Sequence, residues 1–217
     1  MKVEDLYTKI VRWKNRCDDV DTREEMSDVL NKLADEMAEK NAKGIGISKI
    51  VRAARNIVKN VSEFHKVELG GIFKMGEKWA VCDGYRVVRF NEKLPIEDVS
   101  YSGNLYGVFD KDFTNEIQVP EVSAVKEFVL NVNATLPKGV KKNSVPPSKF
   151  AYKVSDSPRV FVDARLLIDV LECLPNCKAY VTDNFAYGVY FVADNGDGVL
   201  MPVRVPKDFE VGEVLYV

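Results

Sequence analysis

Apolar residues recur at helical spacing in three stretches of the first third of the chain, residues 1–16, 22–41 and 48–64. Intervals of three and four residues between apolar side chains are typical of a helix with one buried face. The second stretch opens with Thr22 and Glu25, which form the pattern of a capping box and indicate that a helix begins there. We therefore predict three helices in this part of the chain.

The pattern changes to that of β-strands in residues 69–90. Two polar turns, residues 75–78 and Asp83-Gly84, separate segments that are rich in β-branched and aromatic residues. An Asp-Gly pair between such segments is the strongest hairpin signal that a short sequence offers. We predict two strands and the start of a third, joined by tight turns.

The second half of the chain alternates between helical and strand patterns. A helix is predicted over residues 122–132, because Pro120 suits the first turn of a helix, and another over residues 164–174 with Asp163 as its cap. Proline and lysine collect in residues 133–148, which therefore read as a linker. Strands are predicted over residues 150–154, 159–162, 178–182, 187–193 and 198–205.

Some segments carry a more specific expectation. Residues 100–109 read either as an extra pair of strands or as an irregular loop, and residues 209–217 as a tail with one more short strand. Residues 194–198 begin like a calcium loop but lack the closing glutamate, so we interpret them as a turn.

Pro202 lies inside the strand predicted over residues 198–205. Because proline cannot donate a ladder hydrogen bond, we expect that strand at a sheet edge or at a bulge.

These elements place the chain in the α+β class. A helix followed by strands occupies residues 48–90, and a strand, a helix and three strands occupy residues 159–205. We expect residues 1–46 to form an N-terminal helical extension and residues 47–217 to form one domain.

Composition adds limits on partners and location. Hydrophobic residues make up 46% of the chain and charged residues 29%, and the formal net charge is -2, which excludes a globally basic nucleic-acid binder but not a basic patch on one face. No apolar run reaches the ~18 residues of a membrane span, and the charged first residues do not suit a signal peptide. We expect a cytoplasmic protein without membrane contacts.

The sequence shows no catalytic set, such as a Gly-rich phosphate loop, a nucleophile elbow or a cluster of metal ligands. His65 is the single histidine and fits a surface or capping position. Cys173 and Cys177 lack further metal ligands nearby, while Cys17 and Cys82 lie in apolar patterns typical of buried thiols. We therefore expect no enzyme activity, no cofactor and no metal site.

A group of short motifs resembles one known family in order and spacing. Asp83-Gly84-Tyr85-Arg86-Val87 resembles an Asp-Gly-His-Arg-Leu signature, and Met201-Pro202-Val203-Arg204 resembles a Met-Pro-Met-Arg close. Residues 69–73 loosely resemble a Leu-x-Gly-x-x-Phe strand, Val119-Pro120 a helix entry, and residues 166–171 a Tyr-Leu-Leu-Asp-Val-Leu helix. These motifs belong to the bacterial DNA sliding clamp, the beta subunit of DNA polymerase III, and the resemblance covers roughly residues 48–132 and 158–206.

The resemblance implies a DNA-clamp-like domain that docks a short linear peptide of a DNA polymerase or another clamp-binding protein in an apolar groove. Carried over residue by residue, the groove consists of Leu69, Gly84, Tyr85, Val87, Pro120, Val125, Val199, Met201 and Pro202. An apolar cleft would suit partner side chains such as leucine and phenylalanine, whereas plain core packing is the alternative for its apolar members. Tyr85 replaces the family's histidine and either fills the groove or stacks on its peptide. We expect Arg86 and Arg204 to pair with acids.

The resemblance also implies a contact with double-stranded DNA. Lys49, Arg52, Arg55 and Lys59 line the polar side of the helix over residues 48–64, although most such runs are only a solvated helix face. A single domain cannot encircle DNA, so a ring requires a homo-oligomer with head-to-tail contacts. Two functions follow: a sliding-clamp-like accessory protein of DNA replication or repair, of a phage or mobile element, or a non-ring adaptor or regulator that binds protein partners without DNA.

Overall fold

The computed structural model describes residues 48–62, 65–103, 105–137, 139–140 and 145–206, together with eleven positions between residues 10 and 30. The chain divides into two compact units, Met1–Val51 and Arg52–Val217. Most of the helices predicted over residues 1–16 and 22–41, Cys17 and the tail predicted over residues 209–217 lie outside the described residues.

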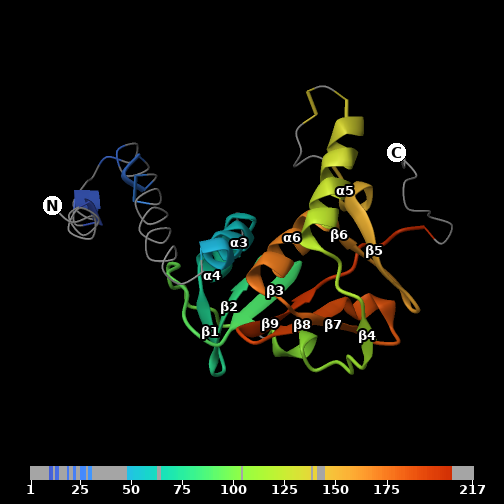
Figure 1. Ribbon diagram of the computed structural model, residues 1–217. Helices are drawn as coiled ribbons and strands as arrows, with labels where there is room; N and C mark the ends of the chain where they lie inside the picture. Colours follow the sequence, from blue (N-terminus) through green and yellow to red (C-terminus); the bar gives the residue numbers. More distant parts are fainter. Residues whose placement is uncertain are drawn as a thin grey trace. The chain divides into compact units, whose positions relative to one another are not determined.

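A seven-stranded antiparallel sheet forms the centre of the second unit, in the order β1-β2-β3-β9-β8-β7-β4 (Figure 1). A separate hairpin pairs β5 with β6. The strands are β1 (Phe73–Met75), β2 (Lys78–Cys82), β3 (Arg86–Phe90), β4 (Asn115–Ile117), β5 (Ala151–Asp156), β6 (Arg159–Asp163), β7 (Lys178–Val181), β8 (Val189–Ala193) and β9 (Gly196–Leu200).

The helices of the described residues from Ser48 onward are α3 (Ser48–Lys59), α4 (Lys66–Leu69), α5 (Val122–Thr135) and α6 (Ala164–Cys173). In Figure 1, α3, α5 and α6 lie on one side of the sheet, and the later part of the segment that joins β3 to β4, with its 3-10 turn at Tyr106–Val108, lies on the other. The predicted cap of α6 is confirmed, because the Asp163 side chain accepts a hydrogen bond from the backbone N–H of Arg165. These helices, together with the antiparallel sheet, confirm the α+β class.

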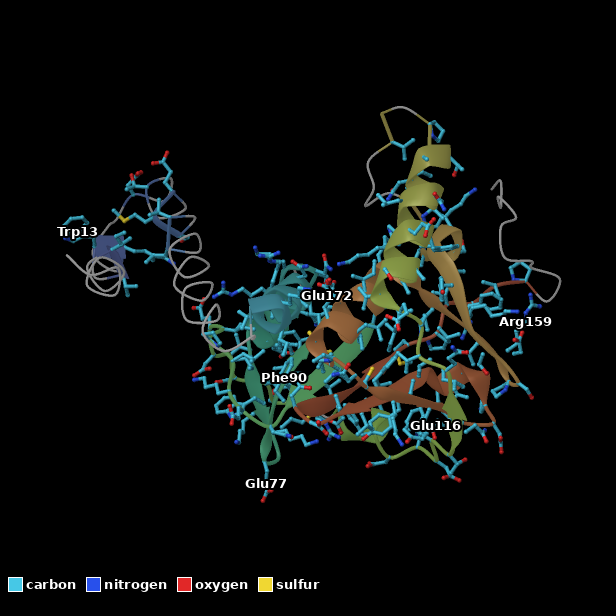
Figure 2. All side chains as sticks on the ribbon, viewed as in Figure 1. Trp13, Glu77, Phe90, Glu116, Arg159 and Glu172 are labelled. Atoms are coloured by element: carbon cyan, nitrogen blue, oxygen red, sulfur yellow. The ribbon has the colours of Figure 1, made fainter. Side chains whose placement is uncertain are left out.

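Both predicted tight turns connect neighbouring strands. Gly76 has a φ of 63° between β1 and β2, and Gly84 has a φ of 90° between β2 and β3. A positive φ is accessible to glycine without the steric cost that a side chain imposes, so these residues fix where the chain reverses. Figure 2 shows Glu77 at the tip of the first hairpin and Phe90 at the far end of β3, where it is buried.

The order of a helix and then a three-strand meander occurs twice. The first occurrence comprises α3, β1, β2 and β3, with α4 inserted, and the second comprises α6, β7, β8 and β9. The last strands of the two meanders pair with each other, with Val87 opposite Val199 and Arg86 opposite Leu200. The three-strand parts of the two units predicted from the sequence thus join into one sheet, whereas β6, the first strand of the second unit, belongs to the separate hairpin.

The strand that contains Pro202 was predicted incorrectly. β9 ends at Leu200 and lies between β3 and β8 in the interior of the sheet, so it is not an edge strand. Just beyond it, the Met201 N–H donates to the Tyr85 carbonyl at 2.8 Å, whereas the Val203 N–H donates to the Phe161 carbonyl of β6 at 2.8 Å. Pro202, which has no N–H, therefore lies where the chain leaves the large sheet and runs beside the hairpin.

Other boundaries also differ from the predicted ones. The α3 helix ends at Lys59, earlier than residue 64, and α5 continues to Thr135. The three-residue strand β4 was not predicted, because it pairs only with β7 at the sheet edge and carries no β-branched run. The described residues of the range 100–109, all but residue 104, form an irregular segment with one 3-10 turn, Tyr106–Val108, and no strand.

Candidate peptide-docking site

The turn at Asp83-Gly84 presents one aromatic side chain to solvent. The Asp83 carboxylate oxygen Oδ1 accepts hydrogen bonds from the backbone N–H groups of Tyr85 and Arg86, at 3.0 and 3.1 Å. This arrangement fixes the turn from within, as aspartate side chains commonly do. Tyr85 is consequently held at the tip, with 65% of its surface exposed.

The C-terminal motif lies directly beside this turn. The hydrogen bond from the Met201 N–H to the Tyr85 carbonyl joins the two segments, although they are more than a hundred residues apart in the sequence. Met201 and Pro202 are both half-buried. The structure therefore brings Gly84, Tyr85, Met201 and Pro202 to one place on the surface.

Arg86 anchors the turn from below. Its side chain is buried and its guanidinium pairs with Asp83 at 3.0 Å and with Asp169 of α6 at 2.8 Å. The same guanidinium donates to the Leu166 carbonyl, and Asn56 of α3 donates to the other Asp169 oxygen at 3.1 Å. The prediction that Arg86 pairs with acids is confirmed, and the pairing joins two of the motifs on which the resemblance depends.

Burial dominates the electrostatics of this ion pair. Desolvation raises the pKa of Asp169 above its ordinary value, although the positive charge of Arg86 and the hydrogen bonds from Asn56 and Arg86 oppose that shift. The Arg86 Nη2 atom is buried without a hydrogen-bond partner among the described residues. Since a buried charged group is costly when its partner is removed, this network should make the turn strongly dependent on Arg86.

The apolar groove residues lie deeper than the turn. Leu69, Val87 and Val199 belong to one buried cluster that also contains Phe73 and Cys82, and none of the three is more than 7% exposed. Met201 packs against this cluster from its margin. The cluster thus continues from the interior to the exposed turn.

An irregular segment covers this cluster. We call residues 98–113 the covering segment; its apolar side chains that pack against the cluster are half-buried, namely Val99, Tyr101, Leu105, Val108, Phe109 and Phe113. In this conformation Leu69, Val87 and Val199 therefore form a covered floor, not an open groove.

Two predicted groove residues lie elsewhere. Side chains alternate between the two faces of a strand, and the Arg86 side chain reaches α6, so the Val87 side chain points to the opposite face. Val125 is fully buried on α5, which packs on α6 and hence belongs to the helical side. Pro120 is half-buried just before α5. No described contact joins Pro120 or Val125 to the turn at Gly84.

The basic residues of α3 share one exposed side of that helix. Lys49, Arg52 and Lys59 are exposed, while Arg55 is half-buried and donates to the Pro95 carbonyl at 3.0 Å. The opposite side of the helix carries the fully buried residues Ala53, Ala54 and Ile57. On the neighbouring helices, Lys126 of α5 pairs with Glu172 of α6, so positive charge there is neutralised.

A second ionic cluster was not recognised from the sequence. Asp197 was assigned to a turn, but it lies within β9, is 3% exposed, and pairs with Arg89 and with Lys78, the latter at 3.2 Å. The Tyr190 hydroxyl also donates to Asp197, at 3.0 Å. The turn itself contains Asp194 and Asn195. The register between β3 and β9, which places Arg89 opposite Asp197, could not be read from either strand alone.

The charges in this cluster perturb two pKa values. Desolvation acts to raise the pKa of Asp197, but the hydrogen bond and charge of Arg89, with Lys78 and Tyr190, outweigh it and hold this pKa below its ordinary value. Burial and the neighbouring Asp197 carboxylate raise the pKa of Tyr190 to about 12. Asp197 is therefore ionised and Tyr190 neutral at neutral pH.

The thiols and the histidine do not form a chemical site in the described structure. Cys82, Cys173 and Cys177 are buried and form no disulfide among the described residues, and burial raises the pKa of Cys82 and of Cys177 to about 11, so the thiols of Cys82 and Cys177 are unreactive at neutral pH. His65 is exposed. The described residues contain no group of three His, Cys, Asp or Glu side chains placed to hold a metal ion.

Comparisons with known proteins identify no relative. No protein-family model matches the chain, and no curated protein and no solved structure matches it. Among the described helices, none has both the length and the apolar character needed to cross a bilayer.

Proposed function

We propose that this chain is a sliding-clamp-like accessory protein of DNA replication or repair, which docks linear peptides of partner proteins. The observation that carries the proposal is the hydrogen bond between Met201 and Tyr85, because it joins the two motifs that most resemble the clamp family. The pairing of Arg86 with Asp169 supports it by joining a third motif to the same turn. The docking site begins at the exposed Tyr85 and the half-buried Met201 and Pro202, and it extends along the apolar cluster.

Replacing Tyr85 by alanine should weaken peptide binding roughly tenfold, because exposed aromatic residues beside an apolar surface often contribute about 1–2 kcal/mol to binding. The probe is a short fluorescein-labelled peptide that carries leucine and phenylalanine among serines, here called the Leu–Phe peptide, measured by fluorescence anisotropy. A peptide with alanine at both apolar positions should bind far more weakly.

Leu130→Ala provides a control, because Leu130 is an exposed apolar residue on α5. Leu130→Ala should leave the affinity for the Leu–Phe peptide within about twofold of the original protein. Equal losses in the two variants would argue against a docking site at Tyr85, and no binding by the original protein would refute peptide docking altogether.

We further propose that the exposed side of α3 contacts double-stranded DNA. Lys49, Arg52 and Lys59 face solvent on one side of this helix, as a helix that follows a phosphate backbone would require. The alternative function, a non-ring adaptor without DNA, is favoured by the pairing of Lys126 with Glu172, which limits the positive charge of the neighbouring helices.

Replacing Lys49, Arg52 and Lys59 together by alanine should abolish the salt-sensitive part of DNA binding. Each phosphate contact contributes a slope of about -0.9 to the dependence of log affinity on log salt, so the loss of three contacts should flatten that slope by about 2.7. Binding to a nicked circular duplex is measured between low and physiological salt. Light scattering coupled to size exclusion establishes the oligomeric state in the same buffers.

An exposed lysine away from α3 serves as the control for this experiment. Lys153 of β5 pairs with Asp156 on the separate hairpin, and Lys153→Ala should leave the salt dependence unchanged. A monomer whose DNA affinity does not depend on salt, in the original protein as in the variants, would instead identify the non-ring adaptor.

A further inference from the structure

The covering segment is bonded through its backbone to the rest of the fold at its start and just beyond its end, but no such backbone hydrogen bond is described between these points. At its start, the Val99 N–H donates to the Ile72 carbonyl at 2.9 Å, and just after its end β4 pairs with β7 in the sheet. Between these anchors, the backbone hydrogen bonds described for residues 100–113 stay within the segment, from Val108 to Leu105 and from Phe113 to Lys111. Segments with few backbone bonds to the rest of the fold open at lower free energy than core strands.

Side chains hold the segment on the sheet. Phe109 lies over the Arg89 guanidinium, 3.5 Å from its carbon to the ring centroid, and Phe113 stacks on Tyr190 with the ring centroids 5.2 Å apart. Tyr101 packs on Phe73 at 4.7 Å. These aromatic side chains are only half-buried, so each of them contacts the sheet on one side and remains partly exposed to solvent.

The surface beneath the covering segment has the properties of a peptide-binding surface. Its floor is apolar, with Val87, Val199 and Phe73, and the guanidinium of Arg89 at one side offers a flat cation to an aromatic ring. Asp197 pairs with both Arg89 and Lys78, and none of the three belongs to the covering segment, so lifting the segment would not leave a buried charge without a partner. Met201 connects this floor to the exposed Tyr85.

We infer that the covering segment is an internal competitor, which occupies the docking surface until a partner peptide displaces it. The inference rests on the proposed docking function. The partner must replace the side chains that the covering segment places on this surface. It therefore carries an aliphatic side chain in the place of Leu105 or Val108. It also carries an aromatic ring in the place of Phe109, which follows Leu105 by four residues. A partner of this kind binds a surface that is only fractionally available, so its apparent affinity is reduced by that fraction.

Removing Phe109 should therefore strengthen peptide binding. Phe109→Ala deletes the ring that lies on Arg89 and raises the population of the open state, so the Leu–Phe peptide should bind roughly tenfold more tightly than to the original protein. Leu130→Ala is the matched control, since Leu130 is 68% exposed on α5 and its loss should not change the affinity. A labelled peptide that copies residues 105–113 should show the same preference for Phe109→Ala.

Hydrogen exchange of the unmodified protein provides a readout that does not depend on the folding of the variant. Addition of the Leu–Phe peptide should accelerate amide exchange in residues 99–113 while exchange in β3 and β9 slows or stays unchanged. Equal peptide affinity of Phe109→Ala and the original protein, with unchanged exchange in residues 99–113, would overturn the internal competitor and leave peptide docking standing. Absence of peptide binding by either protein would overturn both proposals.

Discussion

Replacing Arg86 by methionine is expected to lower the free energy of unfolding by about 3–5 kcal/mol, the usual cost of removing one partner of a buried ion pair. Methionine keeps most of the side-chain volume, so the loss reports charge and hydrogen bonding more than a cavity. The variant leaves Asp83 and Asp169 without their cation, and both residues are buried. Urea unfolding followed by circular dichroism measures the change.

Arg204 is the natural control for this substitution, since it is an exposed arginine just beyond the Met201–Tyr85 junction. Arg204→Met should change the free energy of unfolding by no more than about 0.5 kcal/mol. Adding Asp169→Leu to Arg86→Met should recover part of the lost stability, because it removes one of the uncompensated carboxylates. A loss below about 1 kcal/mol for Arg86→Met would contradict the role assigned to the network.

The second large effect is expected at Asp197. Asp197→Asn removes the negative charge shared by Arg89 and Lys78, and at pH 7 we expect it to lower the free energy of unfolding by about 1.5–3 kcal/mol, the range for hydrogen bonds to charged groups. This estimate lies below that for Arg86 because Arg89 and Lys78 are partly exposed, and solvent screens the charges that remain.

The pH dependence of this difference follows from the direction of the pKa shift. The folded pKa of Asp197 lies below its unfolded value of about 3.9, so ionised Asp197 stabilises the folded state fully above the unfolded pKa. That contribution disappears as the pH falls through the folded pKa, where the carboxyl becomes protonated in both states. The difference in the free energy of unfolding between the original protein and Asp197→Asn should therefore be constant above about pH 5 and approach zero toward pH 2.

Asp194 allows the comparison to be made with a neighbouring aspartate. It is exposed in the turn between β8 and β9, and Asp194→Asn should neither lower stability at pH 7 by more than about 0.5 kcal/mol nor reproduce the pH dependence. If the difference in the free energy of unfolding between the original protein and Asp197→Asn stayed unchanged down to pH 2, packing and not charge would account for the effect of the substitution.

Local signals predicted much of the fold. The two tight turns, the cap at Asp163 and the strands of the β5–β6 hairpin all follow from short-range chemistry, and the structure confirms them. The position of β9 could not be predicted in the same way. Pro202 indicated an edge strand, but the strand ends before the proline, and the absence of an N–H there marks the change from one sheet to the other.

The candidate site was predicted less completely than the fold. The resemblance placed Gly84, Tyr85, Met201 and Pro202 together, and the structure brings them together. It also placed Val125 with them, whereas α5 lies on the helical side of the sheet. Residues 100–109 of the covering segment were left open as loop or strands, because this segment gains its position from contacts with Phe73, Arg89 and Tyr190, which the local pattern does not show.

The sequence by itself determined the two tight turns, the cap at Asp163 and most of the longer helices and strands, but not the short elements α4 and β4, because glycine conformations, helix caps and side-chain periodicity act over a few residues. Only the tertiary structure decided that Arg86 pairs with Asp169, that Arg89 pairs with Asp197, and that the floor around Val87 is covered. Apolar patterns show that a strand face avoids water, but they do not show whether this chain or a partner covers it. That choice depends on long-range packing, here of the covering segment on β3 and β9.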